Sequence, residues 1–371
     1  MIEKNYKAIG LMSGTSLDGV DAALIETDGR DYAKPLAFFY RSYSDEDRKR
    51  IRPVFGQKDR AAAEVLAAED IITQRHIETV KALLAQENLK SEDIDVIGFH
   101  GQTIYHAPQD GMTLQIGDGE ALAKETGIDV VYDFRSKDVQ AGGEGAPLAP
   151  VYHRALAKTA GIKPPFVILN IGGVSNVTWI GEGGDDILAF DTGPGNALMD
   201  DWIQKRTGER YDPDGQYAAA GNPIFELLEA WLAHPYFKRL PPKSLDRNEW
   251  DIADLGGIIS DLTKMQITND GAATLLHFTA QTILTSLEHM PEKPDIWYAC
   301  GGGRHNKALM ELLQQSIHIK SIDDLGWNGD AIEAECFAYL AVRSLLNLPI
   351  SFPKTTGVEH PLTGGEYVPF G

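Results

Sequence analysis

The chain has 371 residues, 43% of them hydrophobic and 24% charged, which is ordinary for a globular protein and suggests about two or three domains with a sizeable core. Its net charge of −20 argues against nonspecific binding to nucleic acid or to an anionic membrane surface. Two cysteines, a start without an apolar leader and the lack of an apolar run of roughly 20 residues point to a protein of the reducing cytoplasm.

The first half of the sequence predicts several strands and one long helix. Residues 6–25 hold two mostly apolar stretches around the polar segment Ser13–Gly19, a pattern typical of strand, turn, strand. Residues 59–86 carry apolar side chains three and four positions apart, which predicts a helix. The other elements expected here are strands at 35–42, 94–100, 113–116 and 129–133 and a helix at 146–157.

The second half repeats the plan of the opening, because 166–180 again reads as strand, Gly-rich turn, strand. Self-similarity at this separation suggests two related halves. The remaining expected elements are a strand that ends at 191, helices at 197–205, 223–233, 271–289, 307–315 and 330–346, and a strand at 295–300, with loops between 233 and 271. Strands that alternate with helices throughout predict α/β architecture.

Three Gly-rich turns, Ser13–Gly19, Gly172–Asn176 and Gly301–Asn306, each follow a strand. Glycines let backbone N–H groups approach an anion closely, and Ser and Thr hydroxyls add donors. Each turn alone is equally an ordinary polar hairpin tip. Taken together they predict a nucleotide site at the strand ends, with hairpin turns holding the phosphates, because neither a P-loop nor a dinucleotide signature is present.

Asp191 closes an apolar strand and precedes the turn Thr192–Asn196. A carboxylate in that place suits a general base that accepts a proton from an attacking oxygen. The alternative is a turn-forming aspartate close before a glycine. Asn196 is a suitable N-cap for the next helix, whose positive end favours nearby anions.

Three further charged residues are candidates, each with a plainer reading. Asp18 could hold Mg²⁺ directly or through water, or be the turn residue of an Asp-Gly pair. Arg135 follows a strand and could pair with a carboxylate or phosphate, or form a surface ion pair. Glu333 opens the last long helix, where acids also complement the helix dipole. A zinc site is not expected from the spacing of His100 and His106, and Cys300 is expected in the core.

The sequence resembles the anhydro-N-acetylmuramic acid kinase family over nearly its whole length. The shared motifs are Gly-Leu-Met-Ser-Gly-Thr-Ser-Leu-Asp-Gly-Val-Asp (10–21), Gly-Phe-His-Gly-Gln-Thr (98–103), Leu-Gln-Ile-Gly-Asp (114–118), Asp-Phe-Arg (133–135), Gly-Ala-Pro-Leu (145–148), Leu-Asn-Ile-Gly-Gly (169–173), Phe-Asp-Thr-Gly-Pro-Gly-Asn (190–196), Pro-Pro-Lys-Ser (241–244), Cys-Gly-Gly-Gly (300–303) and Glu-Ala-Glu-Cys-Phe-Ala (333–338). One departure is Glu144, where this family more usually has glutamine.

The resemblance implies two actin-like (ribonuclease H-like) α/β domains with ATP and Mg²⁺ in an interdomain cleft. The expected boundaries are 1–135 plus about 347–371 for the first domain and 136–346 for the second. The implied reaction opens the 1,6-anhydro ring of 1,6-anhydro-N-acetylmuramic acid with water and phosphorylates O6 with ATP. It yields N-acetylmuramic acid 6-phosphate and serves peptidoglycan recycling and amino-sugar metabolism in the cytoplasm. A homodimer is also implied, with no nucleic acid or membrane partner.

The resemblance also assigns roles to residues. Asp191 matches the catalytic aspartate, which takes a proton from the water that attacks C1, and Arg135 and Glu333 match positions that contact the sugar. The ATP-binding positions are Gly14, Thr15, Ser16, Leu17, Asp18, Gly19, Val20, Asp21, Gly172, Gly173, Gly301, Gly302 and Gly303.

Two other functions stay open at this point. A kinase for another sugar or small acid on the same fold would phosphorylate a free hydroxyl without ring opening. An ATP-driven binding protein like actin or the heat-shock chaperones would need a peptide-binding domain or a polymer contact, and no spare segment suits either.

Overall fold

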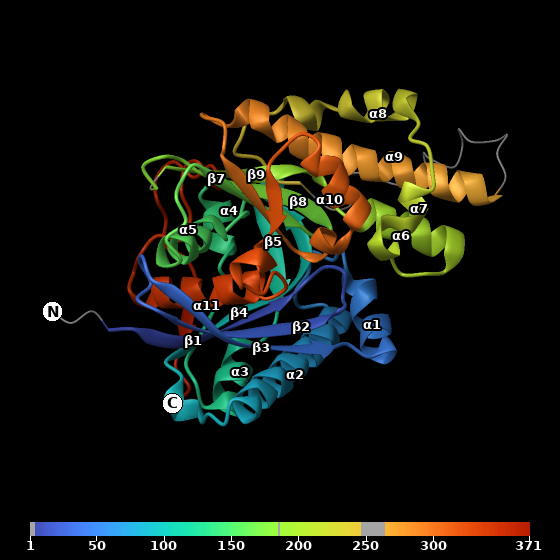
Figure 1. Cartoon of the computed structure of the whole chain (residues 1–371). Coiled ribbons are helices and arrows are strands. Elements are labelled where there is room, and N and C mark those ends of the chain that lie inside the picture. The colour runs from blue at the N-terminus through green and yellow to red at the C-terminus, as the bar shows by residue number, and fades with distance from the viewer. Residues whose placement is uncertain (1–3, 185, 246–263) are drawn as a thin grey trace. The chain divides into compact units, whose positions relative to one another are not determined.

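The computed structural model describes residues 4–184, 186–245 and 264–371, and the contacts within it divide the chain into two compact units. The first unit runs to Lys163 and resumes at Ala331, and the second is Pro164–Asp330 (Figure 1). The boundaries expected at 135 and 346 therefore differ from those observed. The reason is packing, because α5 (Pro150–Thr159) contacts β3 and α11 (Ile332–Leu345) contacts β1, β2 and β4.

The sheet of the first unit begins with an antiparallel meander. Its strands are β1 (Tyr6–Ser13), β2 (Gly19–Thr27) and β3 (Ala33–Ser42). Strand β4 (Val96–Ala107) pairs parallel with β1, and β6 (Val130–Tyr132) pairs parallel with β4. The strand order is β12-β6-β4-β1-β2-β3, with β5 (Met112–Ile116) on β4 and β12 (Glu366–Val368) at the edge.

Helices cover both faces of this sheet (Figure 1). Ile9, Leu11, Ile97 and Phe99 pack into one buried cluster with side chains of α2 (Ala63–Gln86) and α3 (Gly119–Thr126). Because side chains alternate along a strand, the residues between them face the opposite side, where α11 lies. The shorter helices are α1 (Asp45–Ile51) and α4 (Ser136–Gln140).

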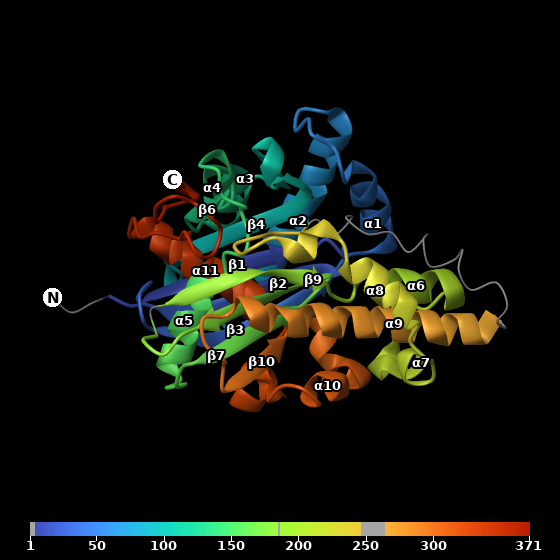
Figure 2. The ribbon, with the colours of Figure 1, turned by 90° about the horizontal axis from the view of Figure 1, so that it is seen from above.

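The second unit is built on the same plan. Strands β7 (Phe166–Ile171), β8 (Val174–Ile180) and β9 (Ile187–Pro194) form an antiparallel meander, and β10 (Ile296–Cys300) and β11 (Ile319–Ser321) add parallel to β7. The helices are α6 (Ala197–Thr207), α7 (Gln216–Ala219), α8 (Phe225–Leu232), α9 (Lys264–Thr285) and α10 (Lys307–Gln314). Figure 2 shows α9 running beside β9, which it contacts.

Both sheets thus consist of an antiparallel meander whose first strand pairs with further parallel strands. The order β3-β2-β1-β4-β6 in the first unit corresponds to β9-β8-β7-β10-β11 in the second. This confirms the α/β architecture and the two related halves that the repeated strand-turn-strand pattern predicted. None of the helices in the described ranges is both long and apolar enough to cross a membrane.

Several local expectations need correction. Strand β4 continues past His100 to Ala107, because this part pairs with β5. Ile104 packs there in the same buried cluster as side chains of β5. The helix expected from 146 begins at Pro150, and α9 begins at Lys264 rather than 271. Part of the expected loop region, 246–263, lies outside the described residues. Helices α1 and α3 were not expected, because both are short.

Candidate active site

The candidate residues of the first unit gather where parallel strands end. The parallel pairing of β1, β4 and β6 ends at one edge, because Leu11 is in register with Phe99, and Phe99 with Tyr132. The register shifts beyond Leu11, so that Ser13 pairs with Gln102 and β4 carries an extra residue there. Such bulges redirect side chains beside functional sites.

The turn Gly14–Asp18 joins β1 to β2 at this edge. The N–H of Leu17 donates to the carbonyl of Gly14 at 3.1 Å, which closes the turn. The Leu17 side chain is fully buried at φ 58°, whereas Ser16 and Asp18 are exposed. A Cβ added to Gly14 would meet nothing nearer than the Ser16 hydroxyl at 3.6 Å, so the turn presents its backbone to open space. That is a suitable cradle for an anion.

A buried hydrogen-bond group lies beneath this turn. The Ser13 hydroxyl donates to Oε1 of Gln102 at 2.7 Å and bonds the Tyr43 hydroxyl at 3.0 Å. All three side chains are nearly inaccessible to solvent. Burial raises the pKa of Tyr43, so the phenol stays neutral. Tyr43 and Gln102 were missed in the sequence, although Gln102 sits in a polar segment directly after a buried strand, which is a usable signal.

Hydrogen bonds to His100 and Gly145 hold Arg135 at the same edge. Its Nε donates to Nε2 of His100 at 2.9 Å, and Nη1 donates to the carbonyl of Gly145 at 2.6 Å. Nδ1 of His100 bonds the carbonyl of Gly101, so the ring is neutral and aims its acceptor nitrogen at Arg135. Burial, and next the charge of Arg135, hold the pKa of His100 well below its usual value. Arg135 is therefore oriented rather than a loose surface cation.

Glu333 lies on the first turn of α11 and is exposed. It is four residues before Phe337, so the two side chains share a helix face. The Phe337 ring lies 4.5 Å from the His100 ring and 5.9 Å from the Arg135 guanidinium. Glu335 is different: it is buried, accepts a bond from the Tyr152 hydroxyl at 2.7 Å, and burial raises its pKa to about 7. Glu333 is thus the carboxylate of this helix turn that faces solvent.

In the second unit a row of polar residues crosses the sheet. Cys300 is in register with Asn170, Asn170 with Asn176, and Asn176 with Asp191. Neighbouring strands are about 4.8 Å apart, so Asp191 lies roughly 14 Å along this row from Cys300. Cys300 is buried in β10, as expected of a core residue.

Asp191 is fixed by a segment some fifty residues further along the chain. The backbone N–H of Leu245 donates to Oδ2 of its carboxylate at 2.8 Å. Its own N–H donates to the carbonyl of Lys243 at 2.9 Å, and its carbonyl accepts from the Tyr236 hydroxyl at 2.6 Å. Directly after it, Thr192 is the extra residue of a bulge between β8 and β9. The carboxylate is therefore aimed by backbone contacts on both sides.

Lys243 places a buried cation in the same neighbourhood. Its Nζ donates to the carbonyl of Tyr236 at 3.3 Å and lies 4.7 Å from the centre of that ring. Burial, and next the charge of Arg239, lower the pKa of Lys243 to about 8, although the charge of Asp191 opposes the shift. A cation near Asp191 favours the ionised carboxylate that a base requires. Lys243 was not expected at the site from the sequence, even though it lies in a shared motif.

The two Gly-rich turns of the second unit come together at the ends of β7 and β10. The N–H of Asn196 donates to the carbonyl of Gly172 at 2.7 Å, and its side chain donates to the carbonyl of Ile171 rather than capping α6. A Cβ added to Gly302 would meet only Asn196 Nδ2 at 4.0 Å. The turn at Gly301 is backed by the nearly buried Arg304, which donates to the Gly301 carbonyl and to Asp323 and Asp330.

No cluster of three or more His, Cys, Asp or Glu side chains suited to a metal occurs in the part of the chain that the structure describes. Within each unit the structure brings together the residues assigned from the sequence: Gly14–Asp18 and Arg135 at one strand edge, and Gly172, Asp191 and Gly301–Gly303 at the other.

Comparison with known proteins gives full-length matches. The family model described as anhydro-N-acetylmuramic acid kinase matches residues 6–369. The chain is 50% identical over 365 residues to the anhydro-N-acetylmuramic acid kinase of Rhizorhabdus wittichii, covering 96% of this chain and 97% of that protein. It is 50% identical over 371 residues to the enzyme of the same name from Zymomonas mobilis, covering 96% and 98%. Component A of (R)-2-hydroxyglutaryl-CoA dehydratase from Acidaminococcus fermentans aligns with a TM-score of 0.47 and 12% identity, over 91% of this chain and 99% of that chain. The family match spans every site residue described above.

Proposed function

The chain belongs to the anhydro-N-acetylmuramic acid kinase family, and from that premise we propose that it uses ATP to phosphorylate 1,6-anhydro-N-acetylmuramic acid as water opens the 1,6-anhydro ring. The observation that carries the proposal is the Asp191 carboxylate, which is 7% exposed and held at one oxygen by the N–H of Leu245. The product is N-acetylmuramic acid 6-phosphate, and the role is peptidoglycan recycling.

In the proposed reaction Asp191 accepts a proton from the water that attacks C1. The bond between C1 and O6 breaks, and its electron pair stays on O6. O6 then attacks the γ-phosphorus, the bond to the bridging oxygen breaks, and ADP leaves. Phosphoryl transfer depends on positioning and charge stabilisation more than on covalent help from the protein. Arg135, held by His100 and Gly145, and the exposed Glu333 are proposed to bind the sugar.

The ATP phosphates are proposed to lie on the backbone of Gly14–Asp21 and of the glycine turns at Gly172, Gly173 and Gly301–Gly303. The open space at Gly14 and Gly302 supports this assignment. Mg²⁺ would neutralise phosphate charge, and Asp18 is proposed to hold it directly or through water. A cytoplasmic homodimer completes the proposal, and light scattering on the purified protein would measure the oligomer.

Mass spectrometry of the product tests the reaction. With ATP, Mg²⁺ and 1,6-anhydro-N-acetylmuramic acid in ¹⁸O-labelled water, we expect a product that gains one phosphoryl group and one labelled oxygen at C1. A product that gains phosphate without label would instead indicate phosphorylation of a free hydroxyl on another kind of acceptor. Absence of any product, with ATP hydrolysed, would support an ATPase.

Gly302→Ala is expected to raise the KM for ATP about tenfold, or roughly 1.4 kcal/mol of binding free energy. The new methyl group meets no protein atom closer than 4.0 Å, and Gly302 lies outside the left-handed region, so the fold tolerates alanine. The methyl group would instead occupy the space in front of the turn. Steady-state kinetics measure the effect.

Gly183→Ala is the control, because its Cβ also meets nothing within 4 Å and lies in a loop away from the assigned residues. An unchanged KM in Gly302→Ala would remove this turn from the nucleotide site.

A further inference from the structure

The segment that follows β3 donates hydrogen bonds to the carbonyl groups of the turn Gly14–Asp18. Nε of Arg48 donates to the carbonyl of Leu17 at 2.9 Å, and Nη2 donates to the carbonyl of Asp18 at 3.2 Å. The N–H of Tyr43 donates to the same Asp18 carbonyl at 2.9 Å. Nη2 of Arg52 donates to the carbonyl of Ser16 at 3.3 Å. Three consecutive carbonyl groups of the turn are therefore bound on one side.

These hydrogen bonds to the carbonyl groups determine where the N–H groups of the turn point. In a planar trans peptide the N–H lies opposite the C=O of the preceding residue. With the carbonyls of Leu17 and Asp18 directed at Arg48, the N–H groups of Asp18 and Gly19 are directed away from α1. These are donors that an anion on the other side of the turn requires.

The turn needs such support because its backbone is strained. Leu17 has φ 58°, a left-handed conformation that is unfavourable for a residue with a side chain. Its side chain packs in a buried cluster with Val20, Tyr43 and Ile51, which anchors the turn from inside. The Arg48 guanidinium secures the same residue at its carbonyl.

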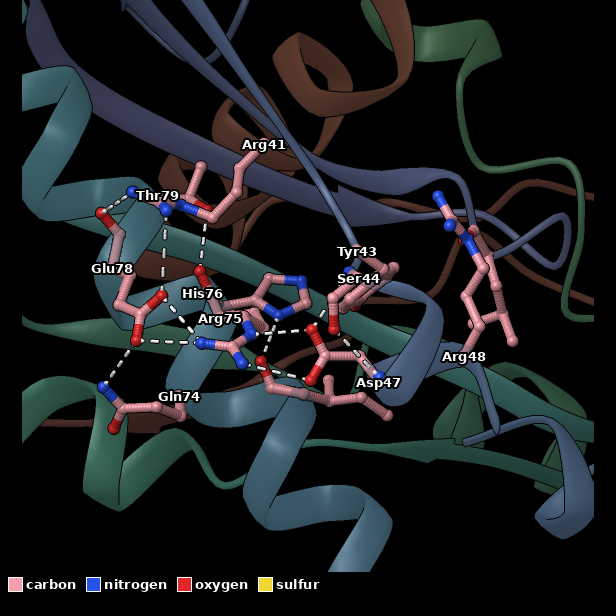
Figure 3. A network of polar contacts seen from close by, with 12 residues as sticks. Arg41, Tyr43, Ser44, Asp47, Arg48, Gln74, Arg75, His76, Glu78 and Thr79 are labelled. Carbon is pink, nitrogen blue, oxygen red and sulfur yellow. Dashed lines mark hydrogen bonds and ion pairs between the residues drawn. The ribbon is translucent and has the colours of Figure 1, made fainter. Parts of the chain in front are cut away.

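Arg48 acts from a rigid platform, because α1 is fixed to α2 (Figure 3). Asp47 accepts two hydrogen bonds from Arg75 of α2, both at 3.0 Å, and closes a capping box with Ser44. Glu78 accepts from the same guanidinium at 3.0 Å. Bidentate pairs of this kind restrict geometry as well as adding energy. The outer Nη1 of Arg48 pairs with the exposed Asp45, a contact worth little by itself.

We propose that Arg48 is a positioning residue for nucleotide binding: by holding the carbonyls of Leu17 and Asp18 it keeps the turn in the conformation that presents its N–H groups to the phosphates. The inference rests on the proposed function only in assigning phosphate to this turn. It predicts that loss of the Arg48 donors weakens the nucleotide and leaves the sugar and the fold unaffected.

Arg48→Met tests this, because methionine keeps an unbranched apolar stem and removes every N–H donor. We expect the KM for ATP and the Kd for ADP, the latter by calorimetry, to rise about tenfold or more, with the KM for the sugar and the Tm unchanged. Arg48→Lys restores the positive charge but not the planar guanidinium that binds two carbonyl groups at once. We expect it to recover only part of the affinity for ATP and ADP. Arg50→Met is the matched control, since Arg50 is an exposed arginine of the same helix whose side chain makes no hydrogen bond or ion pair to the described residues.

Wild-type affinity for ADP in Arg48→Met would overturn the proposal. A lower Tm together with a rise in the KM values for both ATP and the sugar would also overturn it, because that result marks a general structural role. The calorimetric arm separates this inference from the proposed function. If the wild-type protein binds ADP but does not phosphorylate the sugar, the proposed reaction fails while the ADP affinities of the variants still decide the role of Arg48.

Discussion

Asp191→Asn is expected to lower turnover by about 10²–10⁴-fold while the protein keeps its fold and its affinity for ADP. Asparagine has the shape of aspartate, and its side-chain oxygen still accepts the hydrogen bond from the N–H of Leu245 that now reaches Oδ2. The backbone contacts of residue 191 with Lys243 and Tyr236 do not involve the side chain at all. What asparagine lacks is a site of sufficient basicity for the proton of the attacking water.

Three measurements distinguish this role from a structural one: kcat with the sugar, the Kd for ADP and the Tm. Asp324→Asn serves as the control, because Asp324 is an exposed aspartate of the same unit and makes the same change of charge. Turnover within a few-fold of wild type in Asp191→Asn would exclude Asp191 as the base. A large drop in the Tm of Asp191→Asn would instead show that the carboxylate is needed to hold the segment around Leu245 in place.

The backbone of the site could be predicted from the sequence because its signals are local. A polar Gly-rich turn directly after an apolar stretch marks a strand end, and this pattern located Gly14–Asp18, Gly172 and Gly301. The prediction that Asp191 closes its strand was wrong, because β9 continues through the bulge at Thr192 and pairs with β8 as far as Pro194. The repeated strand-turn-strand plan correctly anticipated that both units share one topology. The resemblance to a known family then assigned chemistry to these positions.

The contacts that orient the site could not be predicted in this way, because their partners are far apart along the chain. Arg48 binds a carbonyl 31 residues away, Arg135 binds a ring 35 residues away, and Leu245 binds Asp191 across 54 residues. Each depends on how separate elements pack, and a backbone donor leaves no trace in its residue type. His100 illustrates the limit: the sequence predicts no zinc site there and indicates no other role, whereas in the structure its ring accepts a hydrogen bond that orients Arg135.

The division of the chain fails to follow sequence order for a related reason. Helix α11 lies beyond the whole second unit in the chain, yet it packs on β1, β2 and β4 of the first. The sequence gives a sign of this only in retrospect. Gly10 and Gly98 sit side by side on the central strands β1 and β4, where glycine is otherwise unfavourable, and they leave room for a helix backbone at close range.

Gly10→Ala is therefore expected to destabilise the protein by about 3 kcal/mol or more, the upper end of what overpacking costs. The added Cβ would overlap the carbonyl oxygen of Ala334 and the backbone nitrogen of Ala338 on α11. Neither atom can rotate away as a side chain would, so α11 must shift as a body. Denaturant unfolding measures the loss, with Gly183→Ala as the control for adding a methyl group in open space.

The same shift links packing to function, because α11 also carries the exposed Glu333 and the Phe337 ring against which His100 and Arg135 lie. We expect the KM for the sugar to rise in Gly10→Ala even under conditions where the variant is fully folded, and the Kd for ADP to change less. Wild-type stability in this variant would mean that α11 is free to move off the sheet. The close contact between α11 and the sheet would then not explain the position of Glu333.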